Sequence, residues 1–431
     1  MASPLTSRTS LWSNPSLFAL WGGEFGSRVG ESFFQIALLW YLLEVTESSL
    51  ATGVVTMVSF LPALVVGAWA GVLVDRWNLR RVLLASDVLR LFLTLSMPFL
   101  FFGGWLPVWG VGVMAFLVTS ASAFFNPARD ALIPQLARPD QLLQANSLVQ
   151  SAWQLSLLIG PFFAALLLPF FPTVYLFGMV SLAFTFSMLV LLKLPKAQNH
   201  GNRQEAGESV DRKKGFISVF KIDFLIGYQA LVGDQRVFAI WLITVFNNFF
   251  LMGPVIVGMP VYVKQYLGGD GSDFALVEGT YAGGMIISTW LISRFGGRVD
   301  PTRMLFWGLV YDGLSYVPLL WVDSVNGTLV TIFIHSLGIP AITISRLTAL
   351  HRLVPVEKQG RVFSFFHLAV AGMTALSIGV VGAILTELPA NQLFAIIGVL
   401  SAACGVAGFL LPVFRNGLVG AKPVAFSGQA E

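Results

Sequence analysis

Charged residues are scarce in this chain. They make up 11% of its 431 residues, against 56% for hydrophobic residues, whereas a soluble domain averages about 25% charged residues. A chain with so little charge cannot cover a water-exposed surface of this size, so the composition excludes an ordinary soluble domain and indicates a membrane protein with several spans. The net charge of +4 is explained by basic residues beside the membrane, so we expect no nucleic-acid partner.

Cysteine and histidine are also rare. The single cysteine, Cys404, excludes a disulfide framework and a cysteine metal site, and its apolar surroundings are typical of a small packed side chain. The four histidines show no ligand spacing such as His-x-x-x-His, so no metal site is predicted. His335 and His367 fall in apolar runs and could titrate near neutral pH, but a lone histidine in a membrane span is more often a hydrogen-bonded packing residue.

Two further absences concern catalysis. No nucleotide-binding loop of the form G-x-x-x-x-G-K-[ST] occurs, so ATP-driven pumping is not supported. No nucleophile paired with a general base stands out either. We therefore expect neither an enzyme nor a bound cofactor.

What the sequence does contain is a series of apolar runs, each near the 20 or so helical residues that cross a bilayer. They form two groups of six, at residues 17–43, 50–74, 82–102, 106–126, 141–170 and 173–193, and at 236–263, 274–293, 303–322, 327–349, 360–386 and 390–413. The sequence therefore predicts an all-helical integral membrane fold with twelve transmembrane helices in two six-helix bundles. The first bundle covers residues 1–193 and the second, with a short tail, covers 236–431.

The interval between the bundles, residues 194–235, has two parts. Residues 196–214 are polar and lack large apolar side chains, so we expect a flexible linker. The second part places several apolar side chains near one helical face, behind the basic run at 212–214: Phe216, Phe220, Phe224 and Leu231. This pattern predicts an amphipathic helix on the cytoplasmic leaflet, either as an interfacial tether or as a lipid sensor.

The basic residues predict the orientation of the chain. Of the 26 lysines and arginines, Arg28 and Arg90 lie within spans, Lys264 falls on one side of the membrane, and all the others fall on the opposite side. Because loops rich in Lys and Arg stay in the cytoplasm, both termini and the linker are predicted to be cytoplasmic.

The two halves show a faint internal repeat. An offset of 217 residues aligns the loops after the fourth and tenth spans, pairing Arg129 with Arg346 and Asp140 with Glu357. Two six-span halves in parallel repeat are one of the standard plans of transporters, with the substrate site between the halves near the midplane of the bilayer.

The first predicted span carries an unusual polar stripe, formed by Glu24, Arg28, Glu31 and Gln35. Their spacings of four, three and four residues place the side chains on one helical face. Hydrocarbon cannot solvate such a face, so we expect it to line a polar cavity. Arg28 can neutralise one carboxylate and leave the other to bind a proton. Glu24 is the first candidate for the titrating or cation-binding group, and the alternative is a static stripe of ion pairs facing water.

Other polar residues lie deep in predicted spans. Asp312, in the ninth span, is either a second proton site or the partner of a basic group on another helix. Asn247 and Asn248, in the seventh span, either line the cavity or hydrogen-bond neighbouring helices, because an unpaired buried amide is costly. Asp87 and Arg90 lie one turn apart and are expected to form a local pair.

Residues 71–81 read GVLVDRWNLRR, between the second and third spans. This segment resembles the loop signature G-x-L-a-D-R-x-G-R-[KR] of the major facilitator superfamily. The matching residues are Gly71, Leu73, Asp75, Arg76 and Arg80. Asn78 replaces the second glycine, and asparagine tolerates left-handed backbone better than most residues. The resemblance implies a conformational gate, in which a carboxylate at a helix end pairs with arginine and a helix N-terminus of the other half; the alternative is a basic turn that sets topology only.

Two other segments are similar to the drug:proton antiporter branch of that superfamily, which includes macrolide and siderophore exporters: residues 27–31 (SRVGE) and residues 126–134 (NPARDALIP). Gly160-Pro161 in the fifth span resembles part of the Gly/Pro-rich fifth span of proton-coupled exporters, without the following glycine. Pro161 lacks the N–H for a helical hydrogen bond, so Gly160 and Pro161 are expected to kink the helix.

The resemblance implies a function. It implies efflux of a small amphipathic compound by alternating access, driven by the proton gradient, with no cofactor. The alternatives are a lysophospholipid or metabolite carrier on the same fold, or a membrane sensor that transports nothing. We expect a small-molecule substrate, contacts with membrane lipids, a monomer, and a multi-pass location in a bacterial-type cytoplasmic (inner) membrane.

Overall fold

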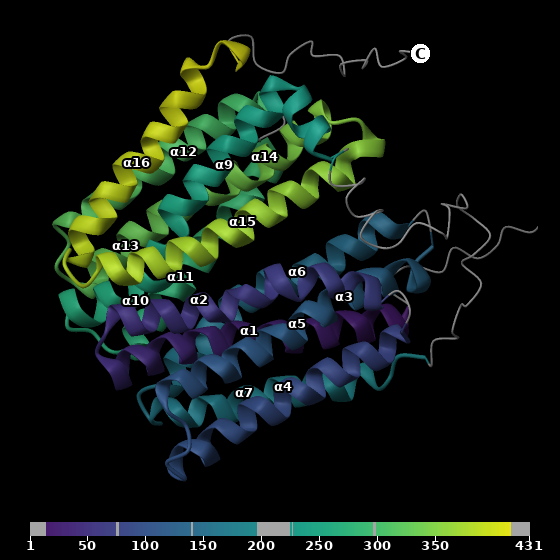
Figure 1. Ribbon diagram of the computed structural model, residues 1–431, viewed down its shortest axis with the longest axis vertical. Helices are drawn as coiled ribbons and strands as arrows, with labels where there is room; N and C mark the ends of the chain where they lie inside the picture. Colours follow the sequence, from purple (N-terminus) through teal and green to yellow (C-terminus); the bar gives the residue numbers. More distant parts are fainter. Residues whose placement is uncertain are drawn as a thin grey trace, which may run out of the picture. The chain divides into compact units, whose positions relative to one another are not determined.

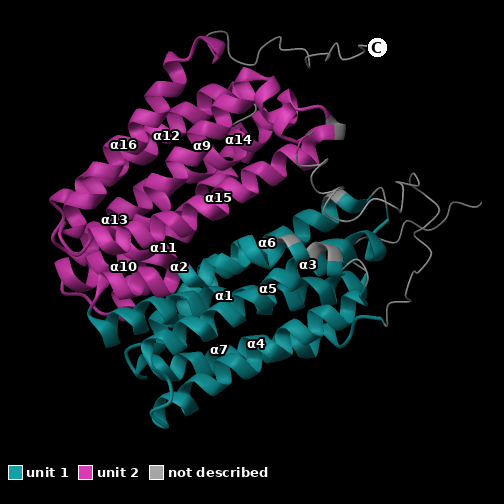
Figure 2. Ribbon diagram, in the orientation of Figure 1, with its two compact units in different colours: residues 1–47, 58–200 teal, residues 48–57, 201–431 magenta. Residues whose placement is uncertain are grey.

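The computed structural model describes residues 14–74, 77–138, 141–195, 225, 227–295 and 299–414, and every regular element in these ranges is helical (Figure 1). By their internal contacts the residues form two compact units (Figure 2). Unit 1 contains residues 1–47 and 58–200, and unit 2 contains residues 48–57 and 201–431. The boundary near residue 200 falls in the predicted linker.

The helices of unit 1 follow the predicted spans closely. They are α1 (Pro15–Thr46), α2 (Ser49–Val65), whose first part belongs to unit 2, α3 (Gly67–Val74), α4 (Leu79–Phe102), α5 (Val108–Leu136), α6 (Leu142–Leu167) and α7 (Thr173–Leu191). Asn14 caps α1, where its side chain accepts hydrogen bonds from two backbone N–H groups of the first turn. Asn78 caps α4 by accepting one hydrogen bond, from the backbone N–H of Arg81, and its own backbone is extended at φ −71°. The left-handed conformation that asparagine tolerates is therefore not used at this position.

Besides the first part of α2 and the helical residues 227–233, the described part of unit 2 is a series of helices, some of them separated by π-helical or 3-10 turns. Its elements are α9 (Gln235–Gly253), the π-helical turn η3 (Pro254–Gly258), α10 (Met259–Val261), the π-helical turn η4 (Tyr262–Tyr266), α11 (Gly271–Phe295), α12 (Pro301–Tyr316), the 3-10 turn η6 (Val317–Leu320), α13 (Val325–Ser336), α14 (Ile339–Leu353), α15 (Val356–Ile384), α16 (Ala390–Leu410) and the 3-10 turn η7 (Pro412–Phe414).

Nine described helical segments are long and apolar enough to cross a membrane: Leu79–Phe102, Val108–Leu136, Gln144–Leu167, Thr173–Leu191, Gln235–Tyr266, Gly271–Phe295, Val325–Leu353, Lys358–Ile384 and Ala390–Leu410. The other three predicted spans correspond to α1 with its charged stripe, to α2 and α3 with the break at Val66, and to α12, which has 16 residues. The all-helical membrane fold is confirmed, and the count of twelve spans stays a prediction.

Two glycines allow α1 to lie very close to its neighbours. A Cβ added to Gly26 would lie 2.6 Å from a ring carbon of Phe186 on α7, and one added to Gly160 of α6 would lie 2.6 Å from Cβ of Ser32. Both distances are shorter than side-chain atoms tolerate, so these positions require glycine. Gly160 is thus explained by helix packing, while the predicted kink at Gly160 and Pro161 stays a prediction.

The predicted interfacial helix lies only partly in the part of the chain that the structure describes. Phe216, Phe220 and Phe224 lie outside the described residues. Residues 227–233 are helical, and Leu231 is 2% exposed in the hydrophobic core of unit 2. The expectation that Leu231 faces lipid was therefore wrong, because its apolar side chain packs against protein.

Candidate functional site

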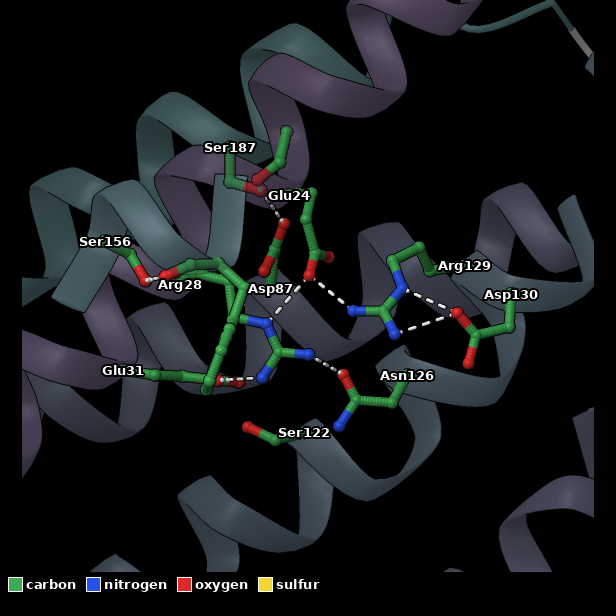
Figure 3. Close-up of polar contacts among 12 residues, drawn as sticks. Glu24, Arg28, Glu31, Asp87, Ser122, Asn126, Arg129, Asp130, Ser156 and Ser187 are labelled. Atoms are coloured by element: carbon green, nitrogen blue, oxygen red, sulfur yellow. Dashed lines mark hydrogen bonds and ion pairs between the residues drawn. The ribbon is translucent and has the colours of Figure 1, made fainter. Parts of the chain in front are cut away.

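Three carboxylates and three guanidinium groups meet inside unit 1. Figure 3 labels five of these six residues, all but Arg90. We call this set the charged network. It comprises Glu24, Arg28 and Glu31 of α1, Asp87 and Arg90 of α4, and Arg129 of α5. Asp130, which also pairs with Arg129, is 63% exposed and is not counted as a member. Among the six members the numbers of acids and bases are equal, so the network is formally neutral when each is charged.

Arg28 occupies the middle of the network. Its Nε lies 2.8 Å from Oε1 of Glu24 and its Nη1 lies 2.8 Å from Oε2 of Glu31. Both acids lie within one turn of it on α1, as their spacing predicted. Its Nη2 donates to Oδ1 of Asn126 at 2.5 Å. All three guanidinium nitrogens are thus occupied, and they connect α1 to α5.

Glu24 is fully buried and has two cationic partners. Its Oε1 accepts from Arg28 and from Nη1 of Arg129, while its Oε2 is buried without a hydrogen-bond partner among the described residues. Arg129 also reaches Asp130, 2.8 Å away. The prediction that Arg28 leaves one carboxylate without a cation is wrong, because α5 continues to Leu136 and brings Arg129, predicted to lie in a loop, to Glu24.

Arg90 joins α4 to the network. Its Nη1 lies 2.7 Å from Oε1 of Glu31, and its Nη2 lies 2.5 Å from Oδ1 of Asp87. The fully buried guanidinium carbon lies 4.7 Å from the ring centroids of both Phe125 and Phe184, which adds cation–π attraction. The predicted Asp87–Arg90 pair is confirmed. The contact between Arg90 and Glu31 could not be predicted from sequence spacing, because the two residues lie on different helices.

Ser187 of α7 also hydrogen-bonds to the charged network. Its Oγ lies 2.5 Å from Oδ2 of Asp87 and 2.7 Å from the backbone oxygen of Gly23. Gln35, the last residue of the predicted stripe, is half-buried and does not join this network. Its Nε2 is buried and has no hydrogen-bond partner in the described ranges. The structure thus brings together three of the four stripe residues.

A pocket of about 310 Å³ opens beside the network. It lies between α5 and α6, and its lining residues include Arg129, Asp130, Asn146 and Gln150. Arg129 lines the pocket and also contacts Glu24, so this one side chain separates the pocket from the buried carboxylate.

The two predicted asparagines of α9 make hydrogen bonds between helices. Asn248 donates to Oγ1 of Thr374 on α15 at 2.8 Å. Asn247 accepts from Ser401 of α16 at 2.8 Å. Both amides are buried, and these contacts agree with the interhelical alternative; cavity lining by either residue stays a prediction.

Asp312 of α12 is fully buried, and a basic group from another helix does face it. Nδ1 of His335 on α13 lies 3.5 Å from Oδ1 of Asp312. His335 is a hydrogen-bonded packing residue, as expected. Its Nδ1 lies 2.9 Å from Oγ of Ser315, and its ring centroid lies 3.8 Å from that of Tyr316. The sequence analysis missed Glu278, a half-buried carboxyl of α11. Like Asp312, it is a carboxylate inside a predicted apolar run, so the same criterion would have selected it.

The predicted gate is only partly described. Asp75 and Arg76 lie outside the described residues, and Gly71 lies in α3. Nη2 of Arg80 donates to the backbone oxygen of Leu192 at 2.7 Å, where it satisfies a carbonyl at the end of α7. Its part in a gate stays a prediction.

Comparisons with known proteins agree with this architecture. The family model described as Major Facilitator Superfamily matches residues 20–268 and 241–425. Macrolide efflux protein A of Streptococcus pyogenes is 25% identical over 354 residues, covering 80% of this chain and 84% of that one. The staphyloferrin A transporter of Staphylococcus aureus is 24% identical over 302 residues, covering 69% and 72%. A solved bacterial homologue of the iron transporter ferroportin has a TM-score of 0.69 at 17% identity, covering 95% and 99%, which shows a shared fold.

Proposed function

The chain belongs to the major facilitator superfamily, and from that premise we propose that this membrane transporter exports a small amphipathic compound in exchange for protons. The match to relatives named as efflux proteins over most of the chain supports export. Alternating access between the two sides of the membrane supplies the transport cycle.

The observation that carries proton coupling is the charged network. Ionisable groups inside membrane spans are expensive to bury and are functional candidates by default. Oε2 of Glu24 is a buried acceptor that lacks a donor among the described residues, so it is the atom that takes a proton in a step of the cycle in which Arg129 leaves the carboxylate. The pocket lined by Arg129 is the place where water comes nearest to that carboxylate through a side chain in contact with it. Glu24 is therefore the first candidate for proton exchange in unit 1, and Arg28, Glu31 and Gln35 complete the polar side of the cavity.

Asn247, Asn248 and Asp312 are the candidates that unit 2 contributes to the cavity. Asp75, Arg76 and Arg80, with Gly71, form the gate. The excess of basic residues on one side supports an orientation with both termini in the cytoplasm, and the match to bacterial relatives supports a bacterial-type inner membrane. The transporter works as a monomer in contact with lipid.

The test is dye efflux from energised cells. Wild type, Glu24→Gln and the control Glu387→Gln are compared with and without an uncoupler. Glu387 is an exposed carboxylate outside the network, so its variant is expected to transport like wild type. Uncoupler-sensitive efflux that is lost in Glu24→Gln supports the proposal.

Two outcomes contradict it. Normal coupling in Glu24→Gln would move the proton site away from α1. An absence of efflux for any cationic or amphipathic dye, with the protein folded in the membrane, would refute broad efflux in favour of a narrow metabolite or lipid carrier.

A further inference from the structure

Unit 2 holds a buried acid without compensation by lysine or arginine among the described residues. Asp312 is fully buried, and neither of its carboxylate oxygens has a hydrogen-bond partner in that part of the chain. There it makes no ion pair with a lysine or arginine, and the basic group that lies within 4 Å of its carboxylate is His335, at 3.5 Å. An isolated ionised carboxylate in such surroundings is very costly, so the group requires a proton or a cationic neighbour.

The hydrogen bonds around His335 show which of its nitrogens carries a proton. Oγ of Ser315 donates to the backbone oxygen of Asp312 at 2.7 Å. That hydroxyl has one proton, so it accepts at its contact with His335 Nδ1, 2.9 Å away. Nδ1 also lies 3.3 Å from the backbone oxygen of Asp312, which can only accept, so Nδ1 carries a hydrogen. Nε2 is buried with no partner in the described part of the chain, and it is the nitrogen free to gain or lose a proton.

Counting charge leaves room for one proton. With a proton on the Asp312 carboxyl, both groups are neutral; with the proton on Nε2 of His335, they form an ion pair. Both states have zero net charge. Without that proton the pair carries a bare negative charge, and with two it carries a bare positive charge. The charged network of unit 1 differs, because three guanidiniums already neutralise its acids.

The helices around Asp312 bring no second permanent charge into contact with it among the residues that the structure describes. α11 contributes Glu278 and Tyr281, whose ring stacks with His335 at 6.1 Å. α12 itself contributes Tyr316. α14 carries Arg346 and α16 carries Cys404, and neither makes an ion pair with Asp312 in the described ranges. Ser401 of α16 faces the carboxyl, but its hydroxyl donates to Asn247.

From this geometry we infer that Asp312 and His335 form a one-proton binding site in unit 2. The proton comes from water when the site opens, is held by the Asp312 carboxyl or by Nε2 of His335, and returns to water on release. Both side chains are 0% exposed, so exchange requires opening of the helices around them. Proton binding at this site stands by itself, and its use in transport rests on the proposed function.

Infrared difference spectroscopy of the purified full-length protein tests the site, because a protonated carboxylic acid has its own C=O stretching band. We expect a band that disappears as pH is raised and is missing in Asp312→Asn. Glu278→Gln is the matched control and is expected to keep the band. An indicator dye should count one proton fewer bound per molecule in Asp312→Asn than in wild type.

His335→Gln is the second variant. Without the imidazole, deprotonation leaves an unpaired buried carboxylate, so the band should persist to higher pH than in wild type. A band that disappears with Glu278→Gln and stays in Asp312→Asn would overturn the assignment. So would a band displaced by sodium at constant pH, which would indicate a metal-cation site, or a His335→Gln titration identical to wild type.

The same variants separate this inference from the proposed function. If the band behaves as expected while wild-type efflux ignores the uncoupler, the proton site stands and proton-coupled efflux fails. If efflux is uncoupler-sensitive while Asp312→Asn leaves proton uptake unchanged, the site fails and the proposed function stands.

Discussion

Removal of Arg90 tests whether the charged network behaves as one electrostatic unit. Arg90→Met keeps an apolar side chain between Phe125 and Phe184 but removes the cation that contacts Glu31 and Asp87. The network then holds three acids and two bases. Breaking a buried ion pair by removing one partner costs about 3–5 kcal/mol, and the lost cation–π contacts add about 1–2 kcal/mol.

The decisive variant adds Asp87→Asn to Arg90→Met. Two acids and two bases then remain, so the network is neutral again, and the amide introduced in place of Asp87 can still hydrogen-bond Ser187. We expect the double variant to be more stable than Arg90→Met alone, although it carries one more substitution. Asp87→Asn alone leaves Arg90 paired with Glu31 and should cost about 1–3 kcal/mol.

Thermal unfolding in detergent, followed by tryptophan fluorescence at one heating rate, gives the order of stability. The expected order is wild type, Asp87→Asn, the double variant, then Arg90→Met, with the last two separated by several degrees. If the two side chains are not coupled, their effects add, and the double variant unfolds at a lower temperature than Arg90→Met. The difference then equals the loss in melting temperature that Asp87→Asn causes in the wild type, and that result would refute the electrostatic unit.

Two other changes probe packing and capping. Gly160→Val places a side chain against Ser32 of α1 and should cost about 1–3 kcal/mol; Gly283→Val is the matched control, since nothing lies within 4 Å of its Cβ position, and equal melting temperatures would contradict the packing argument. Asp234 caps α9; burial alone would raise its pKa, but hydrogen bonds from Arg236 hold the pKa of this carboxyl below its usual value. The ionised Asp234 carboxylate therefore stabilises the fold above about pH 4, its pKa in the unfolded chain, and this stabilisation is lost as pH falls through the lower folded pKa. The difference in melting temperature between wild type and Asp234→Asn should shrink on acidification. A difference that does not change with pH would exclude this role for the carboxylate.

Sequence patterns predicted contacts along single helices better than contacts between them. Glu24, Arg28 and Glu31 are one turn apart on α1, and their ion pairs follow from helical spacing. Arg129 and Arg90 come from α5 and α4, and their contacts with Glu24 and Glu31 depend on how those helices pack. No spacing rule supplies that information, which is why the expectation of an uncompensated acid failed on α1.

Unit 2 shows the same limit. The depth of Asp312 in its span was readable from the sequence, and so was the position of His335 in another span. Their 3.5 Å contact was not, because α12 and α13 meet through packing rather than through chain spacing. Glu278 could have been found from the sequence, since it is a carboxylate inside a predicted apolar run.

The exact balance of acids and bases in the charged network also limits how this protein can change in evolution. A single substitution that removes one charge leaves the remaining buried charges unbalanced by one, so selection should remove it. A lineage can lose Arg90 at little cost only together with Asp87 or Glu31, and can lose Arg129 only together with Glu24. We therefore expect charges at these positions to disappear in pairs across related transporters.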